Sequence, residues 1–301
     1  MRAPLVVLAL VAVATGCGSS SRPSEGGAPR PGSLEALWKQ PGQSVGLIPG
    51  TNDYSPGTVR ISFLVVDNRG RVIAPEKARF WIADSLSATP FQQTTARLED
   101  VGIPGVSTGA PVKALYVAHV RVPSAGTYYV LARPLGPVHI GGVTQIVVKS
   151  HSSTPEVGAR AYPSRTPTLA SAHGRVAQLT TRVPPDRALL HYSIGDSLAA
   201  HVPFVVTFAT PRWCSSRTCG PVVDVVESAR RRFAGSRIRF IHVEIYAGND
   251  PRKGYNPWYR QWRLRSEPWT FLVGADGRIK AKFAGSMSVR ELDGAILRYL
   301  R

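Results

Sequence analysis

The sequence predicts two folded domains of different class, an all-β domain followed by an α/β domain. Residues 47–150 hold short apolar alternations separated by turn residues, with no helical period, which is typical of β-strands. Residues 186–301 alternate buried-strand patterns with amphipathic helix patterns. A chain of 301 residues is long enough to build two cores of this kind.

The N-terminus predicts export and lipid attachment. An apolar run over residues 5–14 follows a short positive start and is too short to span a bilayer. The next residues, Ala14-Thr15-Gly16-Cys17, resemble a bacterial lipobox. We therefore expect residues 1–17 to be a lipoprotein signal peptide that ends at the lipidated Cys17, with the protein anchored on the outer face of the bacterial cytoplasmic membrane. Ordinary secretion is the alternative.

Composition predicts a flexible tether and contact with an anionic surface. Residues 18–46 are rich in Ser, Gly and Pro, which predicts a flexible tether. The net charge of +18 favours contact with an anionic membrane surface, in support of the lipid anchor. No zinc-finger, helix-turn-helix or RNA-binding signature is present, so we expect no nucleic-acid partner.

The all-β domain shows no chemistry of its own. Alternating residues predict strands over 58–65, 78–83, 115–122, 127–131 and 144–149, with a turn and a short strand ending at 73. About seven strands of this length predict a β-sandwich, and the domain loosely resembles the immunoglobulin-like domains of bacterial envelope proteins. His119, His139 and His151 are not spaced as metal ligands. Residues 151–185, rich in Ser, Thr, Pro and Gly, predict a linker.

The second domain follows the order β-α-β, then a hairpin, then a closing helix. We expect strands at 204–208, 237–246, 269–273 and 279–283, and helices at 221–233, 257–262 and 289–300. The pair Cys214 and Cys219 lies between the first of these strands and the first helix. A helix N-terminus favours a thiolate over a thiol, and an extracytoplasmic location lets disulfides persist. The pair is therefore the candidate site of redox chemistry.

Three segments carry a resemblance to the thioredoxin-like superfamily, in particular to redoxins and extracytoplasmic thiol–disulfide oxidoreductases. They are the strand 203–208 that runs into Trp213-Cys214, the segment 267–273 with Pro268 at its start, and the hairpin 274–279. The resemblance covers residues 186–301 and implies an α/β thioredoxin-like fold for them.

The resemblance also implies roles for individual residues. Cys214 would attack a disulfide and Cys219 would resolve the mixed disulfide. Pro268 would be a cis-proline that shapes the substrate groove, and Trp213 would cover the site. The partners implied are protein thiols and disulfides of the cell envelope and a redox partner that recycles the pair. We expect no cofactor and no resident metal.

Two departures from the family's pattern weaken these roles. Four residues separate the cysteines, where the family has two. Because Pro221 suits a helix start, we expect the helix to begin after Cys219. The buried acid of the family's first strand is also missing, so Glu244 and Glu267 become the candidates for proton relay. A carboxylate near Cys214 would raise the pKa of its thiol, which makes Glu267 the more consequential.

Three alternatives stay open at this stage. The first is a non-catalytic binding module of the same fold, in which the Cys214–Cys219 bridge is structural. The second is a thiol peroxidase, although Pro211 and Thr207 stand where that motif needs Thr or Ser and Pro. The third is a copper chaperone, for which a histidine after His242 is lacking.

Overall fold

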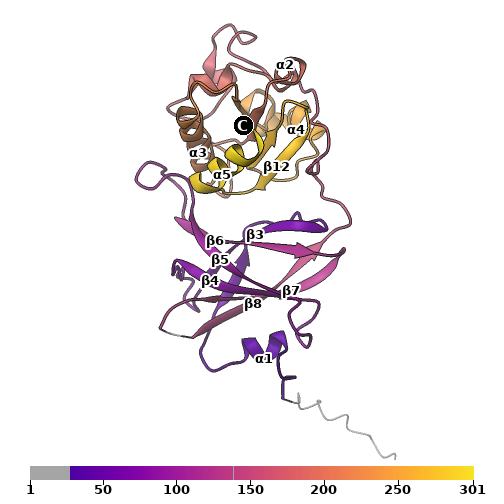
Figure 1. Cartoon of the computed structure of the whole chain (residues 1–301). Coiled ribbons are helices and arrows are strands. Elements are labelled where there is room, and N and C mark those ends of the chain that lie inside the picture. Colours follow the sequence, from indigo (N-terminus) through magenta and orange to yellow (C-terminus); the bar gives the residue numbers. More distant parts are fainter. Residues whose placement is uncertain (1–27, 138) are drawn as a thin grey trace, which may run out of the picture.

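The structure is a computed structural model that describes residues 28–137 and 139–301. The expected signal peptide, the lipidation site Cys17 and the first part of the expected tether lie outside the described residues. The described chain forms a barrel-like β-sheet and, above it in Figure 1, a second unit built on a smaller sheet.

Eight strands form the larger sheet, in the order β1-β8-β7-β4-β5-β6-β3-β2. They are β1 (Gln43–Ser44), β2 (Gly46–Pro49), β3 (Gly57–Val66), β4 (Lys77–Ala83), β5 (Gln92–Asp100), β6 (Ala114–Val122), β7 (Gly126–Pro134) and β8 (Ile140–Val148). All pairs are antiparallel except β1 with β8. The two edges approach each other, because β2 contacts β8 and Tyr54 bridges Val148. The sheet is therefore nearly closed.

Alternating apolar side chains of the strands fill the inside of this sheet. In β3 the side chains of Val59, Ile61, Phe63 and Val65 are buried in one cluster. Phe63 packs against Phe80 of β4 and Tyr116 of β6, with ring centroids 5.3 and 5.4 Å apart. Outside the barrel, helix α1 (Leu34–Trp38) buries Leu34 against Trp81 and Leu131.

The second unit is built on four strands in the order β10-β9-β11-β12. These are β9 (Phe204–Phe208), β10 (Arg239–Val243), β11 (Trp269–Val273) and β12 (Ile279–Ala284). β9 and β10 are parallel, whereas β11 is antiparallel to β9 and β12. The helical segments are α2 (Ile194–Ala199), α3 (Cys219–Arg232), α4 (Pro257–Gln261), α5 (Val289–Tyr299) and the 3₁₀ turns η1 (Val176–Gln178), η2 (Arg187–Leu190), η3 (Ala247–Asn249) and η4 (Pro251–Lys253).

The two faces of this sheet bury different side chains. On one face α3 and α5 pack on β9 and β11, with Val226 and Ile296 in the same cluster as Val205 and Leu272. On the other face Trp262, which follows α4, lies fully buried against Phe208 and Phe271. The end of β9, covered from both sides, is therefore a fixed platform for the residues that follow it.

The fold class expected from the sequence is wrong for this chain. The protein is mostly β, with one nearly closed eight-stranded sheet and one four-stranded sheet; it is neither a two-sheet immunoglobulin-like sandwich nor an α/β thioredoxin-like fold. Alternation identifies which side chains face a core, but it does not distinguish two facing sheets from one sheet that curls. β5 was also missed, because only Ala96 and Leu98 among its nine residues are apolar, too few to show an alternation.

Two connecting segments are more ordered than their composition suggests. The described part of the expected tether, from residue 28, carries α1, β1 and the start of β2. Within the expected linker 151–185, Arg160 bridges Arg278 and the Ala161 N–H donates to the Gly277 carbonyl. Both segments are therefore held against the sheets by backbone hydrogen bonds.

Candidate functional site

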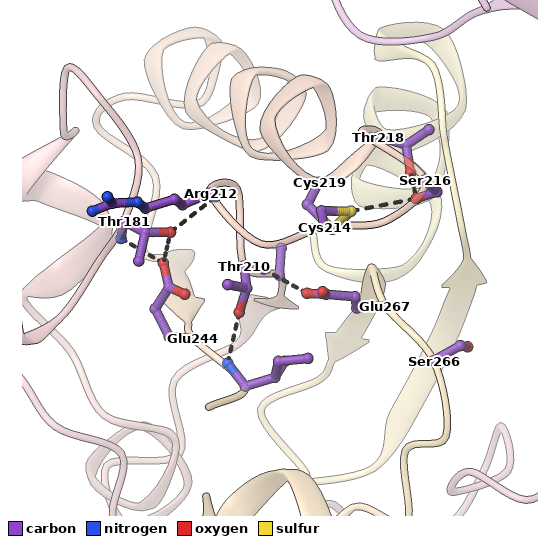
Figure 2. Close-up of a disulfide and its surroundings, with 12 residues drawn as sticks. Thr181, Thr210, Arg212, Cys214, Ser216, Thr218, Cys219, Glu244, Ser266 and Glu267 are labelled. Atoms are coloured by element: carbon purple, nitrogen blue, oxygen red, sulfur yellow. Dashed lines mark hydrogen bonds between the residues drawn. A yellow bond between two sulfur atoms is a disulfide. The ribbon is translucent and has the colours of Figure 1, made fainter. Parts of the chain in front are cut away.

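Cys214 and Cys219 form a disulfide at the point where β9 leads into α3 (Figure 2). Their Cα atoms are 6.0 Å apart, an ordinary separation for a bridge. The intervening residues turn back at Arg217, which has a φ of 55°. Contrary to the sequence-based expectation, α3 begins at Cys219 rather than after it. Pro221 fits here because backbone N–H groups in the first turn of a helix have no carbonyl partner within the helix, so the missing N–H of proline costs no hydrogen bond.

The two sulfurs differ in accessibility and surroundings. Cys214 is 7% exposed, and the Ser216 hydroxyl oxygen lies 3.3 Å from its Sγ. Cys219 is fully buried and belongs to the cluster under α3 and α5. Its place at the first residue of a 14-residue helix lets the helix dipole stabilise a thiolate there. An external sulfur therefore reaches Cys214 first.

Glu267 brings a carboxylate to the disulfide. One of its oxygens and the two sulfurs all lie within 4.8 Å of one another. Its Oε2 accepts a 2.6 Å hydrogen bond from the Thr210 N–H, as Figure 2 shows. Burial raises the pKa of Glu267 to about 7, assisted by the negative charge of Glu244 and opposed by the Thr210 hydrogen bond. This carboxyl group can therefore take up or release a proton near neutral pH.

Pro268 follows Glu267 directly, and the peptide bond between them is cis, as expected from the resemblance. The proline is buried and directly precedes β11, whose first residue pairs with the end of β9. Residues 214, 219, 267 and 268, distant in sequence, are thus brought together by the pairing of β9 with β11.

Glu244 lies just after β10 and does not join this group directly. One of its oxygens, Oε1, accepts hydrogen bonds from the N–H and the hydroxyl of Thr181, at 2.6 and 2.9 Å. Its other oxygen is buried and has no partner among the described residues. Glu244 acts on the site through its charge, which raises the pKa of Glu267.

Trp213 directly precedes Cys214, and its indole binds the segment around Asn249. Its side chain is 44% exposed, and its indole N–H donates to the Asn249 carbonyl at 3.0 Å. The guanidinium of Arg212 lies 4.9 Å from the centre of the indole. Trp213 therefore links the cysteine loop to the η3 segment.

Sequence reasoning missed two threonines that organise the site. Thr210 orients Glu267 through its N–H and accepts the Ile245 N–H on its hydroxyl. Thr181 binds both Glu244 and the Arg212 N–H. The only signal for Thr210 was its position two residues after a buried strand; Thr181 lies in the segment that was expected to be a linker.

A metal ligand set is incomplete while the disulfide is formed. Cys214, Cys219 and Glu267 are the one group of metal-ligating side chains with suitable spacing among the described residues. Both sulfurs are bonded to each other, which leaves a single carboxylate. His242 does not supplement it, because its ring nitrogens face the Ala209 carbonyl and the Thr180 hydroxyl.

No protein-family model and no curated protein sequence matches this chain. Within residues 28–137 and 139–301, none of the helices has the length and apolar character that crossing a bilayer requires. The site itself consists of a disulfide beside a carboxyl group whose pKa is raised to about 7.

Proposed function

We propose that the protein is a thiol–disulfide oxidoreductase that acts through the Cys214–Cys219 pair. The observation that carries the proposal is the position of Glu267, whose carboxylate lies within 4.8 Å of both sulfurs and has a pKa of about 7. Opening a disulfide produces a thiolate that needs a proton, and closing it requires one to leave. A purely structural bridge has no use for such a group.

The steps of the reaction follow from the accessibility of the sulfurs. A client thiolate attacks Sγ of Cys214, a new sulfur–sulfur bond forms, and the electron pair of the broken bond stays on Cys219. Glu267 gives its proton to that leaving thiolate. A second client thiolate then attacks the client sulfur of the mixed disulfide and releases Cys214 as a thiolate. The client dithiol is oxidised to a disulfide and the protein is reduced to the dithiol; the reverse sequence reduces a client.

The location proposed for this activity rests on the N-terminal sequence. The lipobox-like residues 14–17 and the charge of +18 support a lipid-anchored protein on the outer face of the cytoplasmic membrane. Its partners there would be protein thiols and disulfides of the envelope, the anionic membrane surface, and a redox protein that recycles the pair. An oxidising compartment is where such exchange is useful.

A structural disulfide in a binding protein is the second candidate function. It is favoured by one observation, the complete burial of Cys219 in the cluster that joins α3 to the sheet. In that case the bridge fixes the start of α3 and takes no part in turnover.

The reduction potential and a trapping experiment separate the two candidates. An exchanging pair is expected to equilibrate with glutathione and to have a potential above about −300 mV, whereas a structural bridge lies below it. Cys219→Ser, expressed in the native envelope, should accumulate mixed disulfides at Cys214. Cys214→Ser is the matched control, because its remaining sulfur is fully buried. A potential below that limit together with no trapped protein would overturn the oxidoreductase proposal.

A further inference from the structure

We propose that the client of this site is an acidic polypeptide segment, an inference that rests on the proposed function. The observation behind it is an excess of positive charge in two chain segments that lead to the disulfide and to Glu267. Two segments carry it, residues 211–219 and 246–268. Their seven cationic residues, here called the cationic rim, are Arg212, Arg217, Arg252, Lys253, Arg260, Arg263 and Arg265.

Chain position and one hydrogen bond connect parts of both segments to the disulfide. Arg217 lies inside the loop that the disulfide closes. The Trp213 indole binds the Asn249 carbonyl, which places the η3–η4 segment with Arg252 and Lys253 beside the cysteine loop. Arg265 precedes Glu267 by two residues. All seven side chains of the rim are exposed. In Figure 2 the Arg212 side chain projects away from the sulfurs, so it belongs to the outer part of the rim.

Little negative charge offsets the rim. The same two segments contain only Asp250 and Glu267 as acidic residues. Glu244, two residues before the second segment, also acts on Glu267 through its charge, but its side chain is buried. Asp250 is paired with Arg252 at 2.8 Å, and Glu267 is partly buried, with its pKa raised by burial to about 7. Among the described residues, the other six cations of the rim take part in no ion pair within 4.0 Å.

Aromatic side chains at the rim favour a polypeptide over a small anion. Trp213 and Tyr255 are 44% and 43% exposed, and Tyr255 stacks on both Tyr246 and Tyr259. Such surfaces give apolar contact area with few lost rotamers. The client must also bring sulfur to Cys214, which phospholipids and nucleic acids do not. An acidic polypeptide that contains a cysteine complements the positive charge, covers the aromatic surface and supplies the sulfur.

The expected consequence is electrostatic steering. Opposite charge accelerates encounter by 10- to 1,000-fold in favourable cases, and the effect falls as salt shortens the Debye length from about 30 Å at 0.01 M to about 8 Å at 0.15 M. Selectivity between acidic and basic clients should therefore be large at low salt and small at high salt.

The test compares three disulfide substrates with the reduced full-length protein in neutral detergent. Two are peptides with one internal disulfide flanked by four aspartates or by four lysines, and the third is neutral hydroxyethyl disulfide. Each peptide rate is divided by its rate with dithiothreitol, which corrects for intrinsic reactivity. The acidic peptide should react about tenfold faster than the basic one at 10 mM salt, with the ratio falling below about threefold at 300 mM.

Matched variants locate the effect. Arg217→Gln/Arg265→Gln removes two rim charges, and Arg121→Gln/Arg298→Gln removes two exposed charges elsewhere, on β6 and α5. The rim variant should reduce the acidic-to-basic ratio about threefold or more, and the control should leave it nearly unchanged. Equal ratios in both variants, or no preference in the wild type, would overturn the acidic client while hydroxyethyl disulfide still reacts. Failure of hydroxyethyl disulfide to react would instead overturn the proposed function, and this inference with it.

Discussion

Arg60 on β3 and Glu291 on α5 form a bidentate ion pair that joins the barrel to the second unit. Nε of Arg60 lies 2.6 Å from Oε1, and Nη2 lies 3.0 Å from Oε2. The side chains are only 10% and 6% exposed. Burial alone would raise the pKa of Glu291, but Arg60 and its hydrogen bonds outweigh burial and lower it.

Breaking this pair on one side should destabilise the protein. Arg60→Met leaves a buried carboxylate without its partner, a change that costs about 3 kcal/mol of unfolding free energy. In Arg60→Met/Glu291→Gln the charge is gone, so part of the loss should be recovered. Glu291→Gln keeps an acceptor for the Ser288 N–H, which the capping box of α5 requires. Urea unfolding measures both variants, and an equal loss in the two would contradict the explanation.

The loop after β5 packs on the first turn of α3, close to Cys219. Gly102 has a φ of 84°, and a Cβ there would lie 2.7 Å from Cβ of Pro221. The Ser107 hydroxyl donates to Asp224 of α3 at 2.7 Å. Gly102→Ala should therefore lower the free energy of unfolding both through backbone strain and through this clash. The clash should add about 1–3 kcal/mol to the loss.

Gly105→Ala is the matched control for this contact. Gly105 also has a positive φ, 74°, but a Cβ there would meet nothing within 4 Å. Thermal unfolding gives a melting temperature for each variant. The difference between the two melting temperatures measures the cost of the clash at Gly102, because both variants carry similar backbone strain. Equal melting temperatures would mean that the loop does not press on α3.

The pKa of Glu267 predicts how stability changes with pH in the oxidised protein. Its pKa is about 7 in the folded chain against an ordinary 4.5, so the folded state binds the proton more tightly. The resulting stabilisation is complete below about pH 4.5 and is lost as the pH rises through 7. Glu267→Gln should match the wild type at pH 4.5 and exceed its stability above pH 7 by up to about 3 kcal/mol.

Urea titrations at several pH values test this expectation. Glu76→Gln serves as the control, because the Glu76 side chain is 81% exposed. A constant difference between wild type and Glu267→Gln across the range would show that Glu267 titrates normally.

Reduction of the disulfide should lower stability only modestly. The cysteines are five residues apart, and closing so small a loop stabilises the folded state by about 2 kcal/mol. Unfolding with and without reductant measures the difference, and Cys214→Ala/Cys219→Ala should not respond to reductant. Complete unfolding on reduction would instead support the structural bridge.

Most of the longer strands and the cysteine pair were accessible from local sequence patterns. Val59, Ile61, Phe63 and Val65 alternate because one face of β3 meets a core, and that period is visible without a structure. The start of α3 was placed after Cys219, since the sequence does not show how Thr218 turns into the helix. β5, with few apolar residues, gave no signal at all.

By itself, the sequence determined which residues are candidates for the chemistry and where the main strands lie. It placed Cys214, Cys219, Glu267 and Pro268 among the candidates, because residue type and strand boundaries are local properties. Only the tertiary structure decided that one eight-stranded sheet nearly closes and that the Glu267 carboxylate meets both sulfurs while Glu244 stays on Thr181. These relationships depend on how strands far apart in the chain pair and on which side chains that pairing buries. A local sequence pattern does not determine either.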